Sequence, residues 1–259
     1  MARKFLARSP GKSYAHMCHR RALLCLALCV TPLCLCAESV QEIADRIVFA
    51  RGGAAIIKSI QTERMSGTIL AGDQQGSFVM ELKRPDKVRF DLSLGGVSST
   101  KAYDGKTGWK LRPGEAAPPE RMSEAETKEL IGRGDMDGPF LDFAAKGINI
   151  EILGKEMLGP SLVWKLKVIP KAGEPEYYYV ESTGYMVLLR ETAAKKDGQE
   201  YLSQQFFQDF QRVQNTRLPF LVITEDGSSD EPIKLKFHEV ELNVPIDDSR
   251  FTLTLPAAK

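Results

Sequence analysis

Residues 87–94 read Lys87-Val88-Arg89-Phe90-Asp91-Leu92-Ser93-Leu94, with polar and apolar side chains in strict alternation. Successive side chains of a strand point to opposite faces, so this period of two indicates a β-strand with one buried face. Residues 77–82 alternate in a similar way, and Pro85-Asp86 between the two stretches is a turn signal. We therefore predict an antiparallel hairpin over residues 77–94.

The same alternation returns at short intervals through the rest of the chain. Turn residues, among them Asp104-Gly105, Asp197-Gly198 and Asp226-Gly227, separate the apolar runs. Short strands joined by such turns predict one large antiparallel sheet and a fold class that is mainly β with helices (α+β). The further strand patterns lie at residues 148–152, 162–168, 177–180, 186–190, 201–210, 218–224 and 233–242.

Two helices are expected before the strands begin. Val40, Ile43 and Ile47 recur at helical spacing. Gly52-Gly53 should end or kink that helix, because glycine is a poor helix former. Residues 54–60 can form a second short helix.

Two more helical segments interrupt the strands. Ser123 is placed to cap a helix over residues 123–131, and Glu126 completes the pattern of a capping box. Residues 139–146 predict another short helix with proline in its first turn. Both segments carry apolar side chains, so each must bury one face against the sheet.

The first 37 residues have the composition of a secretory signal. Six basic residues and no acidic one precede an almost unbroken apolar run at residues 22–37, too short to span a bilayer as a stable helix. We predict export to the periplasm with cleavage after Ala37, which leaves residues 38–259 as a single domain. Lipid attachment at Cys34 or Cys36 is the alternative, although leucine precedes both cysteines where a small residue is needed.

Cysteine usage and charge narrow the functional classes. All five cysteines lie within the predicted signal, so the mature chain has no disulfide, thiol nucleophile or cysteine metal ligand. Removing the six basic residues of the signal from the total of 35 leaves 29 Lys and Arg against 34 Asp and Glu, a formal net charge of −5. A mildly acidic protein is a poor match for nucleic acid, and we expect no nucleic-acid partner.

Catalytic patterns are weak in this chain. His238 is the one histidine after the signal, and it lies in an alternating strand between Phe237 and Glu239. The Asp135/Asp137 pair resembles the start of a calcium loop, but the remaining ligands of that pattern are missing. We find no phosphate-binding glycine loop, nucleophile elbow or zinc-ligand spacing. We therefore expect neither metal, cofactor nor enzymatic activity.

Several short motifs, in their order along the chain, resemble the LolA family of periplasmic lipoprotein carriers and the wider LolA/LolB-like superfamily. Lys83-Arg84-Pro85 looks like the family's lysine-arginine-proline turn, and Asp104-Gly105-Lys106-Thr107 before Trp109 looks like its hairpin. Gly138-Pro139-Phe140 resembles a short helical segment of the family. Phe251-Thr252-Leu253-Thr254-Leu255-Pro256 resembles its closing strand. Two further stretches, residues 50–53 and 244–251, look like a subgroup labelled outer-membrane lipoprotein-sorting proteins.

The resemblance implies a fold and a function. The fold would be an incomplete antiparallel β-barrel, or half-barrel, whose concave face is covered by a helical lid. The function would be a monomeric periplasmic carrier that takes acyl chains of lipoproteins or other lipids from an inner-membrane donor to an outer-membrane acceptor. The arginine of the lysine-arginine-proline turn holds the lid closed in that family, and the matching residue here is Arg84. Residues 211–233 depart from the carrier proper as an additional or lengthened hairpin.

Candidate site residues follow from the strand pattern and the resemblance together. Alternating apolar residues are core packing first and line a ligand cavity only where one exists. Trp109 and Trp164 can equally be core anchors. The candidates for the acyl-chain cavity are Phe78, Met80, Leu82, Val88, Phe90, Leu92, Trp109, Trp164 and Leu166. The expected apolar face of the lid comprises Leu130, Ile131, Phe140, Leu141 and Phe143.

Two other functions stay open at this point. A LolA-like domain can act as a sensor of the cell envelope that binds lipoproteins or a protein partner without transporting them. An envelope hydrolase is the third reading, and it would depend on His238 or a carboxylate.

Overall fold

The computed structural model describes residues 38–111, 118–196, 199–227 and 231–252. These residues form one compact unit. The predicted signal (residues 1–37) and residues 253–256 of the closing strand expected at residues 251–256 lie outside the described residues.

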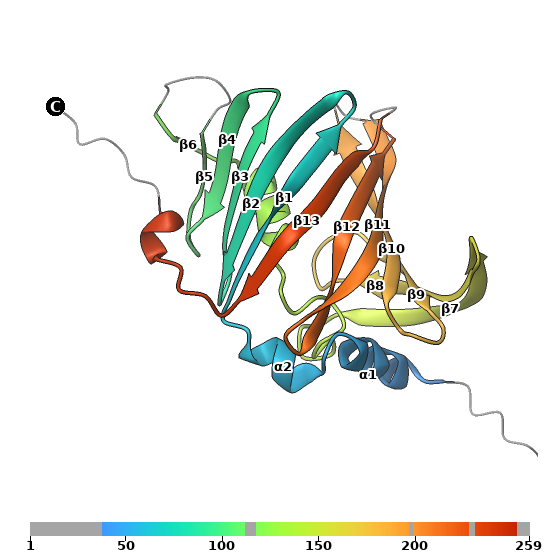
Figure 1. Cartoon of the computed structure of the whole chain (residues 1–259). Coiled ribbons are helices and arrows are strands. Elements are labelled where there is room, and N and C mark those ends of the chain that lie inside the picture. Colours follow the sequence, from blue (N-terminus) through green and yellow to red (C-terminus); the bar gives the residue numbers. More distant parts are fainter. Residues whose placement is uncertain (1–37, 112–117, 197–198, 228–230, 253–259) are drawn as a thin grey trace, which may run out of the picture. The chain divides into compact units, whose positions relative to one another are not determined.

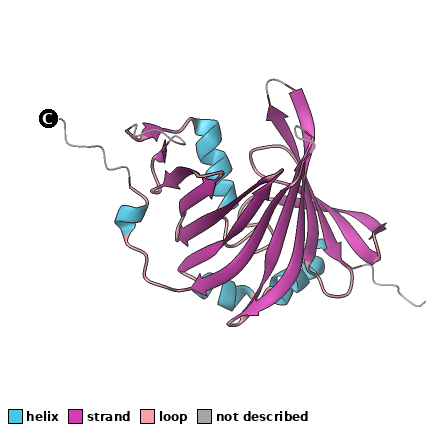
Figure 2. Cartoon of the chain, turned by 45° about the horizontal axis from the view of Figure 1, so that its top comes forward, coloured by secondary structure: helices cyan, strands magenta, loops and turns pink. Residues whose placement is uncertain are grey.

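The described strands form one antiparallel sheet of 13 strands, in the order β6-β5-β4-β3-β2-β1-β13-β12-β11-β10-β9-β8-β7. Its two edges, β6 and β7, do not pair with each other, so the sheet is an open half-barrel, as predicted (Figures 1 and 2). The strand bounds are β1 (Thr62–Ala71), β2 (Gln74–Lys83), β3 (Lys87–Leu94), β4 (Val97–Tyr103), β5 (Gly108–Leu111), β6 (Glu120–Arg121), β7 (Asn149–Leu158), β8 (Ser161–Ile169), β9 (Glu176–Glu181), β10 (Val187–Lys196), β11 (Gln199–Val213), β12 (Thr216–Asp226) and β13 (Ile233–Leu242).

Two meanders make up this sheet, and they join in its middle. Strands β1 to β6 run outward to one edge, and β7 to β13 run inward from the other edge until β13 pairs with β1. A bulge at Ser66/Gly67 interrupts the β1–β13 pairing. A Cβ atom at Gly67 would clash with the carbonyl oxygen of Lys236, so this close approach needs glycine.

The segment between β6 and β7 therefore has to cross the whole sheet. It begins with α3 (Glu124–Arg133), and its Ser123–Glu126 capping box is present as predicted. Helix α3 lies over β3 to β5, and its Leu130 is buried in one cluster with Leu82 of β2 and Val88 of β3. In Figure 1, α3 lies behind these strands. We call this helix-covered face the inner face.

Residues 139–146 do not form the predicted helix. They make a series of turns, and Asp142 adopts a left-handed backbone conformation with φ 53°. One residue in that conformation interrupts the run of helical dihedral angles. Phe140 and Leu141 are nevertheless buried, as expected for an apolar segment that lies on the sheet.

The N-terminal helices cover the other half of the inner face. Helix α1 (Val40–Ala50) has a capping box between Ser39 and Glu42, and α2 (Ala54–Ser59) follows the kink at Gly52-Gly53. Ile43 and Ile47 of α1 are each 1% exposed. They belong to one apolar cluster, whose main members on the sheet and the turns are Phe140, Leu141, Ile150, Leu166, Val168, Tyr178 and Val180.

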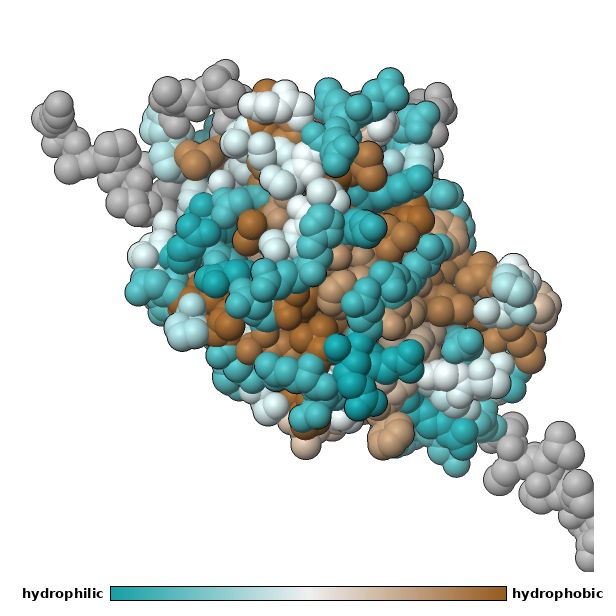
Figure 3. All heavy atoms as spheres, viewed as in Figure 1, coloured by the Kyte–Doolittle hydropathy of each residue, from teal (hydrophilic) through white to brown (hydrophobic). Residues whose placement is uncertain are grey.

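The outer face carries a network of charged side chains. Glu81 is 2% exposed and accepts hydrogen bonds from Arg64 at 3.0 Å and Arg250 at 2.9 Å. Arg89 forms a two-pronged ion pair with Asp91, with both contacts at 2.7 Å. Figure 3 shows hydrophilic side chains interspersed with apolar patches in this view.

The C-terminal segment packs on the same outer face. A 3₁₀ turn, η1 (Asp248–Arg250), places Phe251 where its side chain is fully buried. The backbone oxygen of Phe251 accepts a 2.9 Å hydrogen bond from the indole nitrogen of Trp109. Trp109 is therefore an anchor for this segment.

Removing the Phe251 ring should destabilise the fold. Phe251→Ala should lower the free energy of unfolding by about 3–5 kcal/mol, because it leaves a cavity in a closed site. Urea unfolding followed by circular dichroism measures the loss. Phe49→Ala is the matched control: Phe49 is 80% exposed, so its removal should change stability by less than about 0.5 kcal/mol. Equal losses in both variants would contradict the assignment.

Candidate functional site

A cavity of about 400 Å³ lies on the inner face, between α1, the crossing segment and strands β8 to β12. This volume falls in the range of roughly 300–1,000 Å³ that is usual for small-molecule pockets. Its walls are mainly apolar, and their principal side chains are Ile47, Phe140, Val168, Val187, Phe207 and Phe210. The walls indicate an apolar ligand.

Six of the nine predicted cavity residues share the inner face but lie elsewhere on it. Register pairs Phe78 with Leu92, Met80 with Phe90, and Leu82 with Val88, so all six side chains point to the same side. Helix α3 covers part of this set through Leu130. Met80, Leu82 and Val88 share the cluster of Leu130, and Phe90 packs against it. We call the six residues the floor residues.

The other three predicted cavity residues are divided between the faces. Leu166 and Trp164 pack with the α1 cluster on the inner face. Trp109 faces the opposite side, next to Arg89 and beneath Phe251. The described residues that line the cavity include none of the nine predicted ones.

The expected lid residues also separate. Leu130 packs on β2 and β3, whereas Phe140, Leu141 and Phe143 belong to or pack against the α1 cluster. Ile131 lines a different hollow, and Phe140 alone of the five lines the cavity. The contribution of each residue to ligand binding stays a prediction.

Several cavity residues were not among the sequence candidates. Val187, Phe207, Phe210 and Leu218 come from β10, β11 and β12. The alternation of residues 201–210 and 218–224 marks these segments as strands. The alternation does not determine which side chains face the inner side of the sheet, because a shift of the strand register by one residue moves every side chain to the opposite face.

Arg84 links the crossing segment to the base of the sheet. Its Nη2 atom lies 2.5 Å from Oδ1 of Asp137, and Nε donates to the backbone oxygen of Ile60 at 2.7 Å. Burial raises the pKa of Asp137, but the hydrogen bond and positive charge of Arg84 outweigh this and leave the pKa below its ordinary value. The latch role of Arg84 stays a prediction.

Arg51 is a second anchor for the same segment. Its guanidinium donates to the backbone oxygens of Met136 and Asp137, both at 2.8 Å. The backbone oxygen of Arg51 in turn accepts hydrogen bonds from Thr216 at 2.5 Å and from the backbone N–H of Arg217 at 3.1 Å. The Ala50-Arg51-Gly52-Gly53 motif was noted in the sequence, but this tie between α1, β12 and the crossing segment needed the structure.

Glu63 is a buried carboxyl group beside this anchor. It is 7% exposed, and burial raises its pKa to about 7 against the attraction of Arg51. Burial lowers the pKa of the Arg51 guanidinium, and the surrounding carboxylates oppose that effect. Glu63 therefore changes charge near neutral pH, at the point where the crossing segment is held.

One polar cluster interrupts the apolar cavity wall. Arg190 donates from Nε and Nη2 to the two carboxylate oxygens of Glu176, at 2.9 and 2.7 Å. The hydroxyl of Tyr178 donates to the same carboxylate at 2.7 Å. All three residues line the cavity, and burial raises the pKa of Tyr178.

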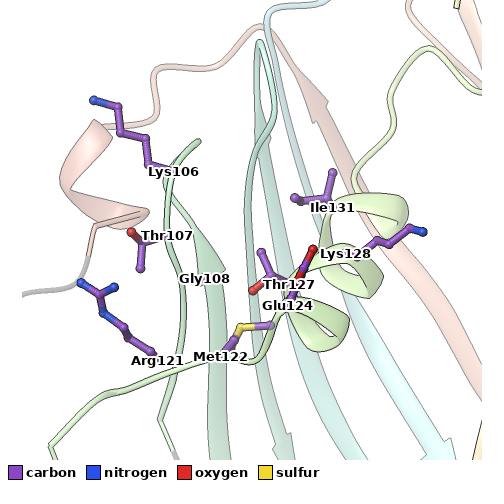
Figure 4. Close-up of a pocket in the computed structure, with 9 residues that line it drawn as sticks. All are labelled: Lys106, Thr107, Gly108, Arg121, Met122, Glu124, Thr127, Lys128 and Ile131. Carbon is purple, nitrogen blue, oxygen red and sulfur yellow. The ribbon is translucent and has the colours of Figure 1, made fainter. Parts of the chain in front are cut away.

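A second hollow, of about 430 Å³, lies between the β4–β5 turn, β6 and α3 (Figure 4). Lys106, Arg121 and Lys128 bring three positive charges to its walls. The ammonium groups of Lys106 and Lys128 point away from its centre (Figure 4). The cations therefore do not converge on a common point.

Other chemistry is sparse in the part of the chain that the structure describes. His238 is exposed, and its Nε2 atom lies 3.3 Å from the hydroxyl of Thr68. Within the described ranges, no group of three or more His, Asp or Glu side chains is placed to hold a metal ion. None of the helices described is long and apolar enough to cross a membrane.

Comparison with known proteins identifies the class of fold. No protein-family model and no curated protein sequence matches the chain. A LolA superfamily protein from Nitrosomonas europaea has a similar structure, with a TM-score of 0.57 and 16% identity over 83% of this chain and 98% of that one. A DUF1329 family protein from Desulfovibrio piger has a TM-score of 0.56 and 12% identity, over 83% and 98% of the two chains.

A third similar structure is a putative outer membrane lipoprotein-sorting protein domain from Vibrio parahaemolyticus. Its TM-score is 0.53 at 12% identity, over 82% of this chain and 95% of that one. The protein is thus a LolA-like half-barrel, and the resemblance drawn from the sequence motifs is confirmed for the fold.

The buried Glu63 predicts a pH-dependent stability. Its folded pKa of about 7 exceeds the ordinary value of 4.5, so the folded state retains a proton that the unfolded state has lost. Stability from this group is greatest below pH 4.5 and declines as the pH rises to 7. Glu63→Gln should therefore change stability little at pH 5 and raise it by up to about 3 kcal/mol at pH 8.

Urea unfolding at the two pH values tests this expectation. Glu129→Gln is the control, because the side chain of Glu129 is 54% exposed. A gain for Glu63→Gln of the same size at pH 5 and pH 8 would refute the role of its ionisation.

Proposed function

We propose that this protein is a periplasmic carrier that binds acyl chains of lipoproteins or other lipids in its inner-face cavity and moves them towards the outer membrane. The observation that carries the proposal is the apolar cavity of about 400 Å³, covered by a crossing segment that Arg51 and Arg84 hold through hydrogen bonds. Burial of each methylene group contributes about 0.8 kcal/mol, so apolar contacts supply most of the binding free energy of a chain of moderate length.

Opening of the cover would expand this cavity. The crossing segment is tied by guanidinium hydrogen bonds, each worth on the order of 1.5–3 kcal/mol, and by the Lys58–Asp142 and Lys110–Glu126 ion pairs. When these break, α3 can lift from β2 and β3. The floor residues Phe78, Met80, Leu82, Val88, Phe90 and Leu92 then become available to the ligand, continuous with the cavity beside α1.

The proposed cycle needs no metal, cofactor or catalytic step. It needs a membrane donor and an acceptor that each favour one state of the cover. The acidic net charge of the chain after the signal should limit non-specific adsorption to anionic membranes. We expect the carrier to act as a monomer.

Native mass spectrometry of the protein exported from its full-length gene is the first test. A stoichiometric lipid or acylated peptide, identified after organic extraction, would support the proposal. A protein that carries no lipid and takes up no fluorescent fatty-acid probe would overturn it. Pull-down would then decide the sensor alternative, which predicts a signalling protein in place of transport machinery.

Arg84→Leu tests the latch. The variant should fold, because the sheet and apolar clusters remain, but it should release a bound fluorescent fatty acid at least tenfold faster. The reason is the loss of the hydrogen bonds that bias the cover towards the closed state. Stopped-flow transfer of the probe to acceptor vesicles measures the rate.

Arg133→Leu is the matched control for this measurement. Arg133 lies on α3 and pairs with Glu129, but both side chains are 54% exposed, so the pair contributes little. If Arg84→Leu released the probe at the wild-type rate, the proposed role of Arg84 in holding the cover closed would be contradicted.

A further inference from the structure

The polar cluster in the cavity wall is built to hold one guanidinium in a fixed orientation. Glu176 binds Arg190 through two hydrogen bonds, and Tyr178 fixes Glu176 through a third. The Arg190 side chain is 29% exposed, and Arg190 lines the cavity. A two-pronged pair of this kind restricts rotation of the guanidinium, so its remaining N–H groups keep a defined direction.

Those remaining N–H groups lack a good acceptor among the described residues. Nη1 lies 3.5 Å from Oε1 of Gln205. That distance is beyond the usual range of an N–H···O hydrogen bond. A hydrocarbon that filled the cavity would exclude water from Nη1 and leave its hydrogens unpaired, which disfavours binding.

The cavity therefore selects for an oxygen acceptor attached to an apolar chain. Apolar side chains such as Val187, Phe207 and Phe210 suit the chain, and Arg190 suits the oxygen. An amine head is disfavoured, because it offers no acceptor to Arg190. In addition, Arg51, Arg190 and Arg217 outnumber the carboxylates of Asp135 and Glu176 among the residues that line the cavity. The volume of about 400 Å³ suits one chain of moderate length.

We propose that Arg190 is the recognition residue of this cavity, and that it donates to the acyl oxygen of a single-chain ligand. The inference rests on the proposed lipid-binding function and adds the polar group that the ligand must carry. The oxygen can belong to the carboxylate of a free fatty acid or to the ester carbonyl of an acyl chain attached to a lipid.

Three ligands of equal chain length, dodecanoate, methyl dodecanoate and dodecylamine, separate these chemistries. Each competes with a fluorescent fatty-acid probe for the exported full-length gene product, below its micelle concentration. Wild type should bind at least one of the two acyl compounds tenfold or more tightly than the amine. A preference for dodecanoate alone assigns a free fatty acid, and binding of both acyl compounds assigns ester-linked chains as well.

Two variants of the pair shift affinity in opposite directions. The double variant Glu176→Gln/Arg190→Gln leaves no unpaired charge and should weaken binding of the preferred acyl compound about tenfold, with little change for dodecylamine. Glu176→Gln alone frees Arg190 from its neutralising partner and should strengthen dodecanoate binding severalfold. A purely structural role of the pair would weaken all three ligands in both variants.

Two controls distinguish a loss of ligand recognition from a loss of folding. Arg190→Lys should retain part of the preference for the acyl oxygen, and urea unfolding checks that each variant folds. A double variant that folds and keeps the wild-type preference overturns the role of Arg190 but leaves the lipid-binding function standing. Failure of wild type to bind any of the three ligands or the probe overturns both.

Discussion

The antiparallel pairing of β1 with β13 is the constraint on which the rest of the structure depends. It joins the two meanders in the middle of the sheet, so β6 and β7 become opposite edges although they are neighbours in sequence. The connection between them must traverse the sheet, and it does so on the inner face, where α3 packs against Leu82 and Val88. The cover of the half-barrel is thus a consequence of strand order.

A cover made in this way is held by polar as well as apolar contacts, and the ion pairs Lys58–Asp142 and Lys110–Glu126 are among them. Arg51 reaches it from the end of α1 and Arg84 from the β2–β3 turn, and both meet it at Asp137. The apolar contacts of Leu130 and Phe140 lie on either side of this point, in two separate clusters. Met136 packs against the first cluster and Phe140 belongs to the second, so the guanidinium contacts at Asp137 lie between the two. A buried Glu63 beside Arg51 makes that place sensitive to pH.

Local pattern predicted the elements well where one physical signal dominated. Residues 87–94 form β3 as expected, because strict alternation leaves no competing period. Ser123 and Glu126 form the capping box that their spacing indicates. The prediction of a helix at residues 139–146 was wrong. The left-handed backbone of Asp142 interrupts the segment, and no residue pattern in the sequence predicts that conformation.

The candidate site was only partly accessible to the same reasoning. Alternation within one strand determines that Phe78, Met80 and Leu82 share a face, and register extends this to their partners on β3. Alternation could not determine which face of the sheet carries Trp109, because that face follows from the pairing of β4 with β5. Nor could it find Phe207, Phe210 or Arg190, because their meeting with α1 depends on strands from distant parts of the chain.

From the amino-acid sequence alone came the strand patterns of β2, β3 and β7 to β13, the capped helix α3 and the class of fold, since period, turn chemistry and motif order are local properties. No strand was predicted for β1, β4, β5 or β6. Tertiary structure alone decided where the cavity lies and what covers it. The physical reason is that a cavity is bounded by contacts between residues far apart in sequence. Those contacts are set by the β1–β13 pairing and by the anchoring of the crossing segment. Neither of these produces a periodic pattern in the amino-acid sequence.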